Sequence, residues 1–503
     1  MDKYNNISIE DLVKQASEIL LDKNPHASLN EIYFEDDNLL FNNYLNNKLF
    51  INEYSKEIIF PSLSINLIVR PECNQTCEYC YIYKYGDELY PKEQRVSNKI
   101  TLSNIQKLLK YFLKRKCYIP RWELFAGDLF YDNLWFDLMD VFYEYFKEML
   151  DIPLLEDTLK QKKIVSSISI PCNFSFCHDK NKVELVQKYI DKFAKLHIRI
   201  HFSYSHDGYY SLDVREKKEL TEDYYNTVFN FIKKNGFGTH PMISYEGIKE
   251  GIQNYEWWKE QYKKYNLNYG DILPMFLEVR NDGWTKENIQ DYLNLLNYMI
   301  EDRLKMCDNN IGEFAKHIFS FKEKISKLPP MYNNDLIRLK AESKQNTKIT
   351  CNMGHGISIK SSNLTIVPCH RMAYPYFEAG QFIVKNGEIT HIEIKNNVDA
   401  YYAMTNGNFL MFPKCAACEY RFFCMKGCLG SQYETFGDYN IPIQSVCDLF
   451  QAKIDFLFKK YHELGVFKYY FDNISEFTEE QINSKRVLEF LLYKGYKEYD
   501  KYL

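Results

Sequence analysis

Three cysteines follow one apolar run so closely that they indicate a shared metal site. The stretch PECNQTCEYCYIY, residues 71–83, places Cys73, Cys77 and Cys80 directly after SLSINLIV at 62–69, which we expect to be a buried strand. Thiolates at this density suit soft metals, either zinc or iron–sulfur clusters. A structural zinc site takes four ligands, whereas three thiolates leave one metal position open to a substrate or cofactor. The spacing therefore favours a reactive metal site, with a zinc knuckle or a redox thiol pair as the alternative.

Composition and charge exclude several classes of protein. The chain has 503 residues, of which 46% are apolar and 16% aromatic, and this favours globular folding over disorder. Its net charge of -5 comes without a basic block, so we expect no nucleic-acid partner. The first residues, MDKYNNISIEDL, lack the regions of a signal peptide, and no apolar run approaches the ~20 residues of a membrane span. We therefore expect a cytoplasmic protein with no membrane partner.

Fourteen cysteines need an explanation other than disulfides, because a reducing compartment seldom keeps disulfides. Seven further cysteines form spaced groups. They are the pair Cys351 and Cys369, the Cx2Cx5Cx3C run Cys415, Cys418, Cys424 and Cys428, and the more distant Cys447. The remaining ones are expected to be small buried hydrophobes: Cys117, Cys172, Cys177 and Cys307.

Strands alternate with helices over the first two thirds of the chain. Strand candidates are 62–69, 121–130, 163–173, 198–208, 239–244 and 272–282. Apolar residues recur at three- and four-residue intervals in the helix candidates 100–115, 134–150, 182–196 and 223–236. This alternation predicts an α/β fold of βαβ units around a parallel sheet, which binds ligands at the C-terminal ends of its strands.

The stretch CNQTCEYCY resembles the Cx3CxΦC signature of the radical S-adenosylmethionine (SAM) enzymes, with Tyr79 at the aromatic position. The resemblance implies that Cys73, Cys77 and Cys80 hold a 4Fe–4S cluster whose fourth iron is chelated by SAM. It also implies a partial (β/α)6 TIM-like barrel with the cluster loop after the first strand. The six strand candidates agree with that number of units.

Later stretches resemble the turns with which this family contacts SAM. RWELFAGDLF at 121–130 keeps one glycine and the acidic residue of the family's Gly-Gly-Glu-Pro turn. The resemblance assigns SAM contacts to Tyr79, Ala126, Gly127, Asp128, Asn173, Ser205 and Arg215. A guanidinium can pair bidentately with the SAM carboxylate. The alternative for Arg215 is a surface arginine that opens a charged helix.

The second cysteine group resembles the SPASM extension, which carries auxiliary iron–sulfur clusters. The resemblance implies an outer cluster on Cys415, Cys418, Cys424 and Cys447 and an inner one on Cys351, Cys369 and Cys428, and hence three 4Fe–4S clusters in all. Where the family has a glycine five residues before the second cysteine of the pair, we expect Asn363 to supply the turn one residue earlier. The inner site lacks a fourth ligand, and three completions stay open: His355 or Cys307, a water or small ligand, or a substrate thiolate.

The resemblance favours a peptide maturase. A 5′-deoxyadenosyl radical would abstract hydrogen from a ribosomally made peptide, and the auxiliary clusters would accept the electron as a thioether, C–C or C–O crosslink forms. Sulfatase-maturating relatives carry an Asp where this chain has His370, which can act as a base near neutral pH or hydrogen-bond a cluster sulfur or the backbone. The implied partners are a peptide or small-protein substrate and an external electron donor such as flavodoxin or ferredoxin. The alternatives are a sulfatase-maturating type of protein oxidase and a non-catalytic iron–sulfur or zinc protein.

Four segments are expected along the chain. They are an N-terminal cap or peptide-recognition segment at 1–61, the radical SAM core at 62–330, the SPASM domain at 331–466 and a helical tail at 467–503. The stretch KLPPMYNND, at 327–335, is the expected linker between core and extension.

Overall fold

The structure, a computed structural model, describes most of the chain from residue 64 onward. The described residues are 64–115, 119–151, 164–215, 220–267, 276–319, 337, 339, 357–395, 412–424, 427–477 and 484–503. The predictions for the segment 1–61, the linker at 327–335, Cys117, Cys351 and His355 lie outside them.

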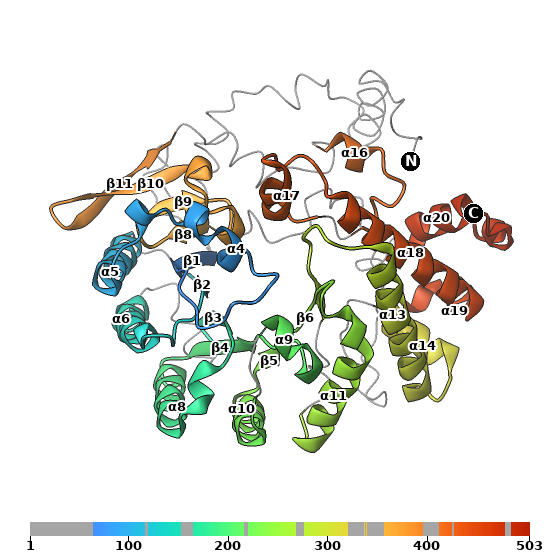
Figure 1. The fold of residues 1–503 in the computed structure, drawn as a ribbon, viewed down its shortest axis with the longest axis horizontal. Coiled ribbons are helices and arrows are strands. Elements are labelled where there is room, and N and C mark those ends of the chain that lie inside the picture. Colours follow the sequence, from blue (N-terminus) through green and yellow to red (C-terminus); the bar gives the residue numbers. More distant parts are fainter. Residues whose placement is uncertain are drawn as a thin grey trace.

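A nine-stranded sheet lies at the centre of the molecule, in the order β11-β10-β9-β8-β1-β2-β3-β4-β5 (Figure 1). Five neighbouring strands run parallel to one another: β1 (Ser64–Arg70), β2 (Arg121–Ala126), β3 (Ser166–Cys172), β4 (Ile198–Tyr204) and β5 (Gly238–Thr239). Their apolar side chains are buried, as the fully enclosed Ile65 and Leu67 of β1 show. Parallel strands covered by helices are expected to be apolar in this way.

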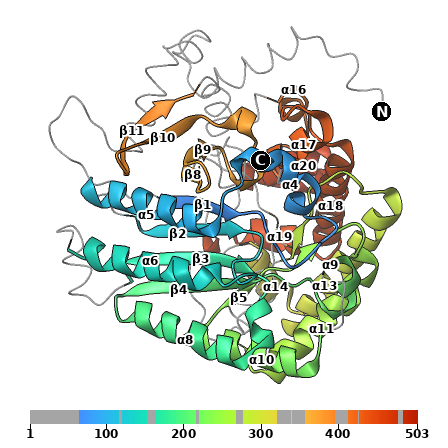
Figure 2. The same cartoon turned by 60° about the vertical axis from the view of Figure 1, so that its left-hand side comes forward.

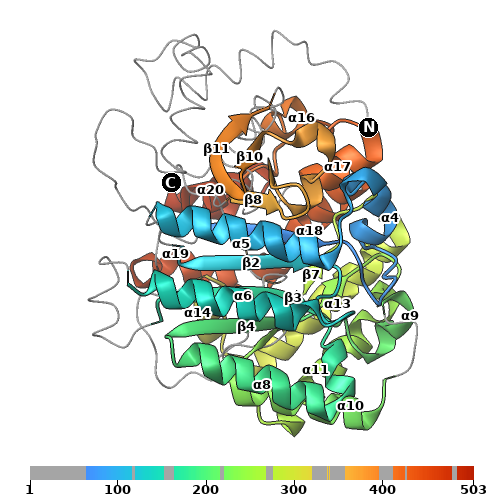
Figure 3. The ribbon, with the colours of Figure 1, turned by 90° about the vertical axis from the view of Figure 1, so that its left-hand side faces the viewer.

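Helices form an arc around the parallel strands (Figure 1). They are α5 (Asn98–Lys114), α6 (Leu134–Met149), α8 (Lys180–Ala194), α10 (Glu222–Asn235), α11 (Gly251–Lys264) and α13 (Lys286–Met306), followed by α14 (Ile311–Ile318). Figures 2 and 3 show α5, α6 and α8 side by side. The four predicted helices are thus confirmed, with bounds shifted by one or two residues. Across the described part of the chain, no helix is both long and apolar enough to cross a bilayer.

The strand predicted at 239–244 is two short strands. Pro241 has no N–H to donate to a ladder, and the chain changes partner there. His240 N donates to Tyr204 O of β4 at 2.7 Å, whereas Pro241 O accepts from Leu277 N at 3.1 Å. The residues beyond it, β6 (Met242–Ile243), pair in parallel with β7 (Leu277–Glu278) in a separate sheet. The predicted class, an α/β fold on a partial barrel of parallel strands, is confirmed in this interrupted form.

The extension continues the barrel sheet instead of forming a sheet of its own. Strand β8 (Ile357–Lys360) pairs in parallel with β1, and β9 (Thr365–Val367), β10 (Gly380–Lys385) and β11 (Glu388–Ile394) follow in antiparallel order. The helices that follow β11 are α16 (Pro413–Ala416), α17 (Leu429–Phe436), α18 (Gln444–Glu463), α19 (Val466–Asp472) and α20 (Ser484–Tyr493) (Figure 1). The extension and barrel therefore share one sheet.

The turn between β8 and β9 differs from the expectation for Asn363. The residue with left-handed backbone is Leu364, at φ 58°, while Asn363 is not among the positive-φ residues. Leu364 stands five residues before Cys369, where the resembled family carries glycine. Its side chain is buried, whereas the Asn363 amide donates to Glu378 Oε1 at 3.0 Å. Burial of Leu364 in the core offsets the cost of a backbone conformation that leucine rarely adopts.

Candidate functional site

The loop after β1 carries the first three cysteines. Cys77 is buried, Cys80 is half-buried and Cys73 is exposed, and none of the three is in a disulfide. Cys80 N donates to Cys77 O at 3.0 Å in a tight turn, and helix α4 (Tyr81–Leu89) begins at the next residue. The Cys77 thiol lies 3.7 Å from the backbone oxygen of Arg215. The loop is thus seated against the segment that follows β4.

Gly127 lets the end of β2 approach the cysteine loop. Gly127 N donates to Arg70 O at 3.0 Å, and Asp128 N donates to Glu72 O at 2.7 Å. A Cβ at residue 127 would lie 2.0 Å from the Glu72 oxygen, so a larger residue would have to push the loop away. Ala126 is the last residue of β2. The Ala-Gly-Asp turn therefore lies directly against the cysteine loop.

Two further predicted residues belong to the same end of the sheet. The buried Asp128 carboxylate accepts from Ser175 Oγ at 2.7 Å and from Phe130 N at 2.9 Å. Asn173 Nδ2 donates to Asn74 Oδ1 of the cysteine loop at 2.8 Å.

Ser205 comes directly after β4, and its N–H donates to Cys172 O at 2.8 Å. The C-terminal ends of β1 to β4 therefore meet around the loop, the place at which parallel sheets bind ligands.

Arg215 is buried beside Tyr79 and Asp207, so the surface-arginine alternative is wrong. Its Nη1 donates to Tyr79 Oη at 2.5 Å and to Asp207 Oδ1 at 3.1 Å. Tyr79 Oη in turn donates to Asp207 Oδ2 at 2.5 Å. Burial raises the pKa of Tyr79 well above its usual value, so this hydroxyl keeps its proton. The arrangement places a desolvated guanidinium next to the cysteine loop.

Asp207 is a site residue that the sequence prediction missed. Besides Arg215 and Tyr79, its carboxylate accepts from Met242 N at 2.8 Å. The signal was its position in SHDG, an acidic residue directly after a strand. In this stretch the resemblance assigns SAM contacts to Ser205 and Arg215 alone, so the prediction does not include Asp207.

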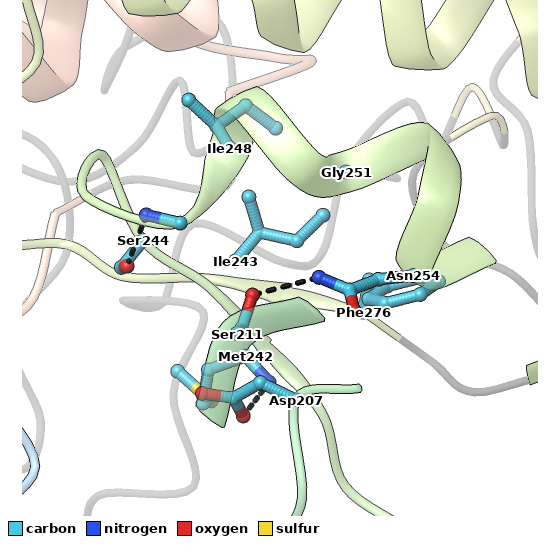
Figure 4. Close-up of a pocket in the computed structure, with 10 residues that line it drawn as sticks. Asp207, Ser211, Met242, Ile243, Ser244, Ile248, Gly251, Asn254 and Phe276 are labelled. Atoms are coloured by element: carbon cyan, nitrogen blue, oxygen red, sulfur yellow. Dashed lines mark hydrogen bonds between the residues drawn. The ribbon is translucent and has the colours of Figure 1, made fainter. Parts of the chain in front are cut away.

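A small cavity lies next to Asp207 (Figure 4). Its polar lining includes Ser211, Ser244 and Asn254, and Asn254 Nδ2 donates to Ser211 Oγ at 2.7 Å. Gly208, at φ 127°, makes room for Asn254, because a Cβ there would lie 2.3 Å from Asn254 Oδ1. The cavity has room for about one water molecule, so it extends the polar surroundings of Asp207.

The chemistry of the first three thiols fits an iron–sulfur cluster. Burial raises the pKa of Cys77 to about 12; the Arg215 charge opposes this rise, and the Cys80 and Cys73 thiols add to it. Metal binding would therefore displace protons from these sulfurs. Among the described side chains, no three His, Cys, Asp or Glu converge on a single metal ion. Cys77 nevertheless lies close enough to Cys73, Cys80 and the Arg215 guanidinium for their charges to affect its pKa.

The predicted outer set lies in α16, in the segment that follows it and in α18. Cys415 is in α16, Cys418 N donates to Cys415 O at 3.2 Å, and Cys424 N donates to Tyr420 O at 2.9 Å. Cys447 lies in the first turn of α18, where burial raises its pKa to about 11 and the nearby Cys418 thiol adds to the rise. The structure thus brings members of the predicted outer set near one another.

The predicted inner set is described in part. Cys369 follows β9, and Cys428 is the residue before α17. The charge of Arg371, two residues after Cys369, interacts with Cys428. Cys307, one of the possible fourth ligands, is buried at the C-terminal end of α13. The other buried cysteines, Cys172 and Cys177, are enclosed as predicted.

His370, in the extension, contacts Tyr81 of α4 and Phe125 of β2. Its Nδ1 is 2.7 Å from Tyr81 Oη, and its ring stacks on Phe125 with centroids 4.1 Å apart. Burial and, to a lesser degree, the Arg371 charge together lower its pKa to about 4, so the imidazole is neutral at physiological pH. Because Tyr81 follows Cys80 and His370 follows Cys369, this hydrogen bond joins the residues next to two predicted cluster ligands.

Comparisons with known proteins find similarity among solved structures only. No protein-family model matches the chain, and no curated protein matches it. Native anSMEcpe with bound AdoMet is similar at 13% identity and a TM-score of 0.45, over 80% of this chain and 99% of that one. Streptococcus suis SuiB bound to S-adenosylmethionine is similar at 13% identity and a TM-score of 0.40, over 87% of this chain and 88% of that one. SuiB bound to precursor peptide SuiA gives 14% identity, a TM-score of 0.40 and the same coverage.

Proposed function

We propose that the chain is a radical SAM enzyme with a SPASM-type extension that modifies a ribosomally made peptide. The observation that carries this proposal is the three-thiol loop at the C-terminal end of β1, seated against the buried Arg215–Asp207–Tyr79 group. Three thiolates leave one iron of a 4Fe–4S cluster open, and a guanidinium beside them suits the carboxylate of an amino acid that chelates this iron.

The chain's own residues have distinct tasks in this proposal. Cys73, Cys77 and Cys80 would hold the cluster, which together with bound SAM supplies a 5′-deoxyadenosyl radical. Gly127 keeps the β2 turn close to the loop, and the acidic Asp128 suits the amino group of SAM. Asn173, Ser205 and the Ala126 turn line the same end of the sheet. Positioning and water exclusion are the protein's share of the chemistry.

The extension would hold two auxiliary 4Fe–4S clusters, which makes three in all. Cys415, Cys418, Cys424 and Cys447 form the proposed outer set, and Cys351, Cys369 and Cys428 the inner one. Such clusters span potentials from roughly -700 to +450 mV, so they can accept an electron from a substrate radical. A crosslink, thioether or C–C or C–O, is the oxidation we propose. His370 follows Cys369 and is neutral at physiological pH, but its lowered pKa makes the imidazole a weak base, so we propose that it serves mainly as the hydrogen-bond partner of Tyr81 and not as the base near neutral pH that the sequence suggested.

The proposed partners are a peptide or small-protein substrate and an external electron donor such as flavodoxin or ferredoxin. The cytoplasm is the proposed location, because the clusters and thiols need a reducing compartment. The His370 imidazole, which stands where sulfatase-maturating relatives carry an Asp, favours the peptide maturase over that type of oxidase.

Reductive cleavage of SAM tests the proposal. Anaerobically reconstituted protein given dithionite and SAM should form 5′-deoxyadenosine, measured by chromatography. Cys77→Ala should abolish its formation. The matched control is Cys177→Ala, which removes a buried thiol outside the spaced groups and should leave the yield within about twofold. Absence of 5′-deoxyadenosine from iron-loaded wild type would contradict the proposal.

A further inference from the structure

Among the residues that the structure describes, no strand pairing joins the last strand of the partial barrel to the first. In the described residues, β7 pairs with β6, whereas β1 pairs with β2 and β8. The loop after β7 nevertheless reaches the cysteine loop after β1. Asn281, in this loop, makes the contact through its side-chain amide.

The Asn281 amide joins three segments that are far apart in the sequence. Its Nδ2 donates to the backbone oxygen of Tyr79 at 3.1 Å. Its Oδ1 accepts from Arg371 Nη2 at 2.7 Å and from Ser431 Oγ at 3.3 Å. These partners belong to the cysteine loop, to the turn after Cys369 and to α17. The donor side of the amide thus faces the loop, and its acceptor side faces the extension.

The extension side of this contact is itself fixed. Arg371 Nε donates to Glu434 Oε1 at 2.8 Å, and its Nη2 donates to Glu434 Oε2, which makes a bidentate pair. A Cβ at residue 430 would lie 2.5 Å from Arg371 Cγ, so Gly430 lets α17 pack closely on the arginine. A guanidinium held in this way has little freedom to leave Asn281.

The loop side is fixed at its other end. Tyr79 lies between Cys77 and Cys80, and its hydroxyl is held by Arg215 and Asp207. Asn281 holds the carbonyl of the same residue. Asn281 therefore holds the backbone of Tyr79, and Arg215 and Asp207 hold its hydroxyl. Asn281 contacts the extension, and Arg215 is the residue that we assign to SAM binding.

We propose that Asn281 is a positioning residue that sets the cysteine loop, and with it the SAM site, relative to the extension. This inference rests on the proposed function. Loss of the Asn281 Nδ2 donor would free the Tyr79 backbone, whereas the Arg371–Glu434 ion pair of the extension would remain. The consequence is weaker SAM binding without loss of the fold.

The test uses Asn281→Asp in the full-length, cluster-loaded protein. Aspartate keeps the oxygen that accepts from Arg371 and Ser431 but loses the N–H that donates to Tyr79. We expect the SAM dissociation constant, measured by equilibrium dialysis, to rise about tenfold. The SAM concentration for half-maximal 5′-deoxyadenosine formation should rise equally, with the rate at saturating SAM within about threefold of wild type. Hydrogen exchange should speed up in residues 71–80.

The matched control is Asn104→Asp on α5. Asn104 Nδ2 donates to the backbone oxygens of Ser361 and Ser362 at 2.9 and 3.0 Å, so the same substitution removes the same kind of long-range bond away from the cysteine loop. It should leave SAM affinity within about twofold of wild type. An equal loss of SAM affinity in this control would overturn the proposal, because the loss would then reflect a general loosening of the fold and not the contact with Tyr79.

A second variant covers the case in which Asn281→Asp does not fold. Ser431→Ala removes one bond to Asn281 Oδ1 and should weaken SAM binding about twofold to threefold. Unchanged affinity in every folded variant of Asn281 and Ser431 would overturn the inference while the proposed function stands. Wild type that binds no SAM would instead overturn the proposed function, and the inference with it.

Discussion

The extension joins the barrel on two sides that are built differently. On the β1 side, β8 adds a parallel backbone ladder that runs from Ile65 and Ile357 to Ile68 and Lys360. On the β7 side, side chains make the joint, and they include the buried Glu278–Lys453 ion pair. A backbone ladder depends on no particular polar side chain, whereas a buried pair leaves a charge unpaired when one partner is lost. Loss of one partner of the Glu278–Lys453 pair should therefore cost more stability than trimming an apolar side chain of the β8 ladder.

The largest effect is expected from Lys453→Met. Lys453 Nζ donates to Glu278 Oε1 at 2.7 Å, and both residues are buried. The variant leaves the Glu278 carboxylate with the Tyr292 hydroxyl, at 2.6 Å, and with the charge of Arg280, but without its ion-pair partner. We expect the free energy of unfolding to fall by about 3 to 5 kcal/mol in urea titrations.

The control for this prediction removes both charges. The double variant Glu278→Leu, Lys453→Met should recover most of the lost stability, because no charge then remains buried. A loss below about 1 kcal/mol in the single variant would show that the pair is solvated and that the two sides do not differ in this way.

Lowering the pH should reduce stability by a smaller amount, and the pH at which the loss occurs distinguishes His206 of the barrel from the Glu278–Lys453 pair. Burial and, to a lesser degree, the Arg215 charge together lower the pKa of His206 to about 3. The unfolded chain therefore takes up this proton first, so stability falls as pH drops below about 6.5, by about 3 kcal/mol near pH 4.5 for one such histidine. Although burial alone would raise the pKa of Glu278, Lys453 holds it below the usual value, so the ion pair persists through this range.

Urea titrations at pH 6.5, 5.5 and 4.5 check the assignment. His206→Phe should show a shallower decline than wild type, since it removes one of the protons taken up. The double variant without the ion pair should decline in parallel with wild type. A steeper decline of wild type than of that double variant above pH 4.5 would place the acid-sensitive group at the joint instead of in the barrel.

The smallest effect is expected on the ladder side. Ile359 of β8 is fully buried, and Ile359→Val removes one methylene while the backbone bonds to β1 remain. We expect a loss of about 1 kcal/mol in the free energy of unfolding. If this conservative change costs as much as Lys453→Met, the ladder depends on its side chains and the comparison between the two sides is wrong.

The sequence predicted what depends on local pattern. The helices and the barrel strands follow from apolar periodicity, and the cysteine loop falls directly after β1 because strand and spacing are both readable in PECNQTCEYCYIY. The prediction of one continuous strand at 239–244 was wrong. The chain pairs with β4 before Pro241 and with the β7 segment from Pro241 onward, and this change of partner depends on the tertiary structure.

Contacts between distant residues could not be predicted. Asn281 meets Tyr79 across 202 positions, and nothing in its own neighbourhood marks it. Leu364 adopts a left-handed backbone that its residue type disfavours, because tertiary burial outweighs local preference. Asp207 carried a signal in SHDG, but its partner Arg215 is fixed only by the fold.

The central claim is that Cys73, Cys77 and Cys80 hold an iron to which SAM binds directly. The most direct measurement is the electron paramagnetic resonance spectrum of the dithionite-reduced, cluster-loaded protein with and without SAM. We predict that SAM changes the signal of one cluster and that Cys77→Ala removes this response while the remaining signals persist. A spectrum that SAM leaves unchanged would contradict the claim.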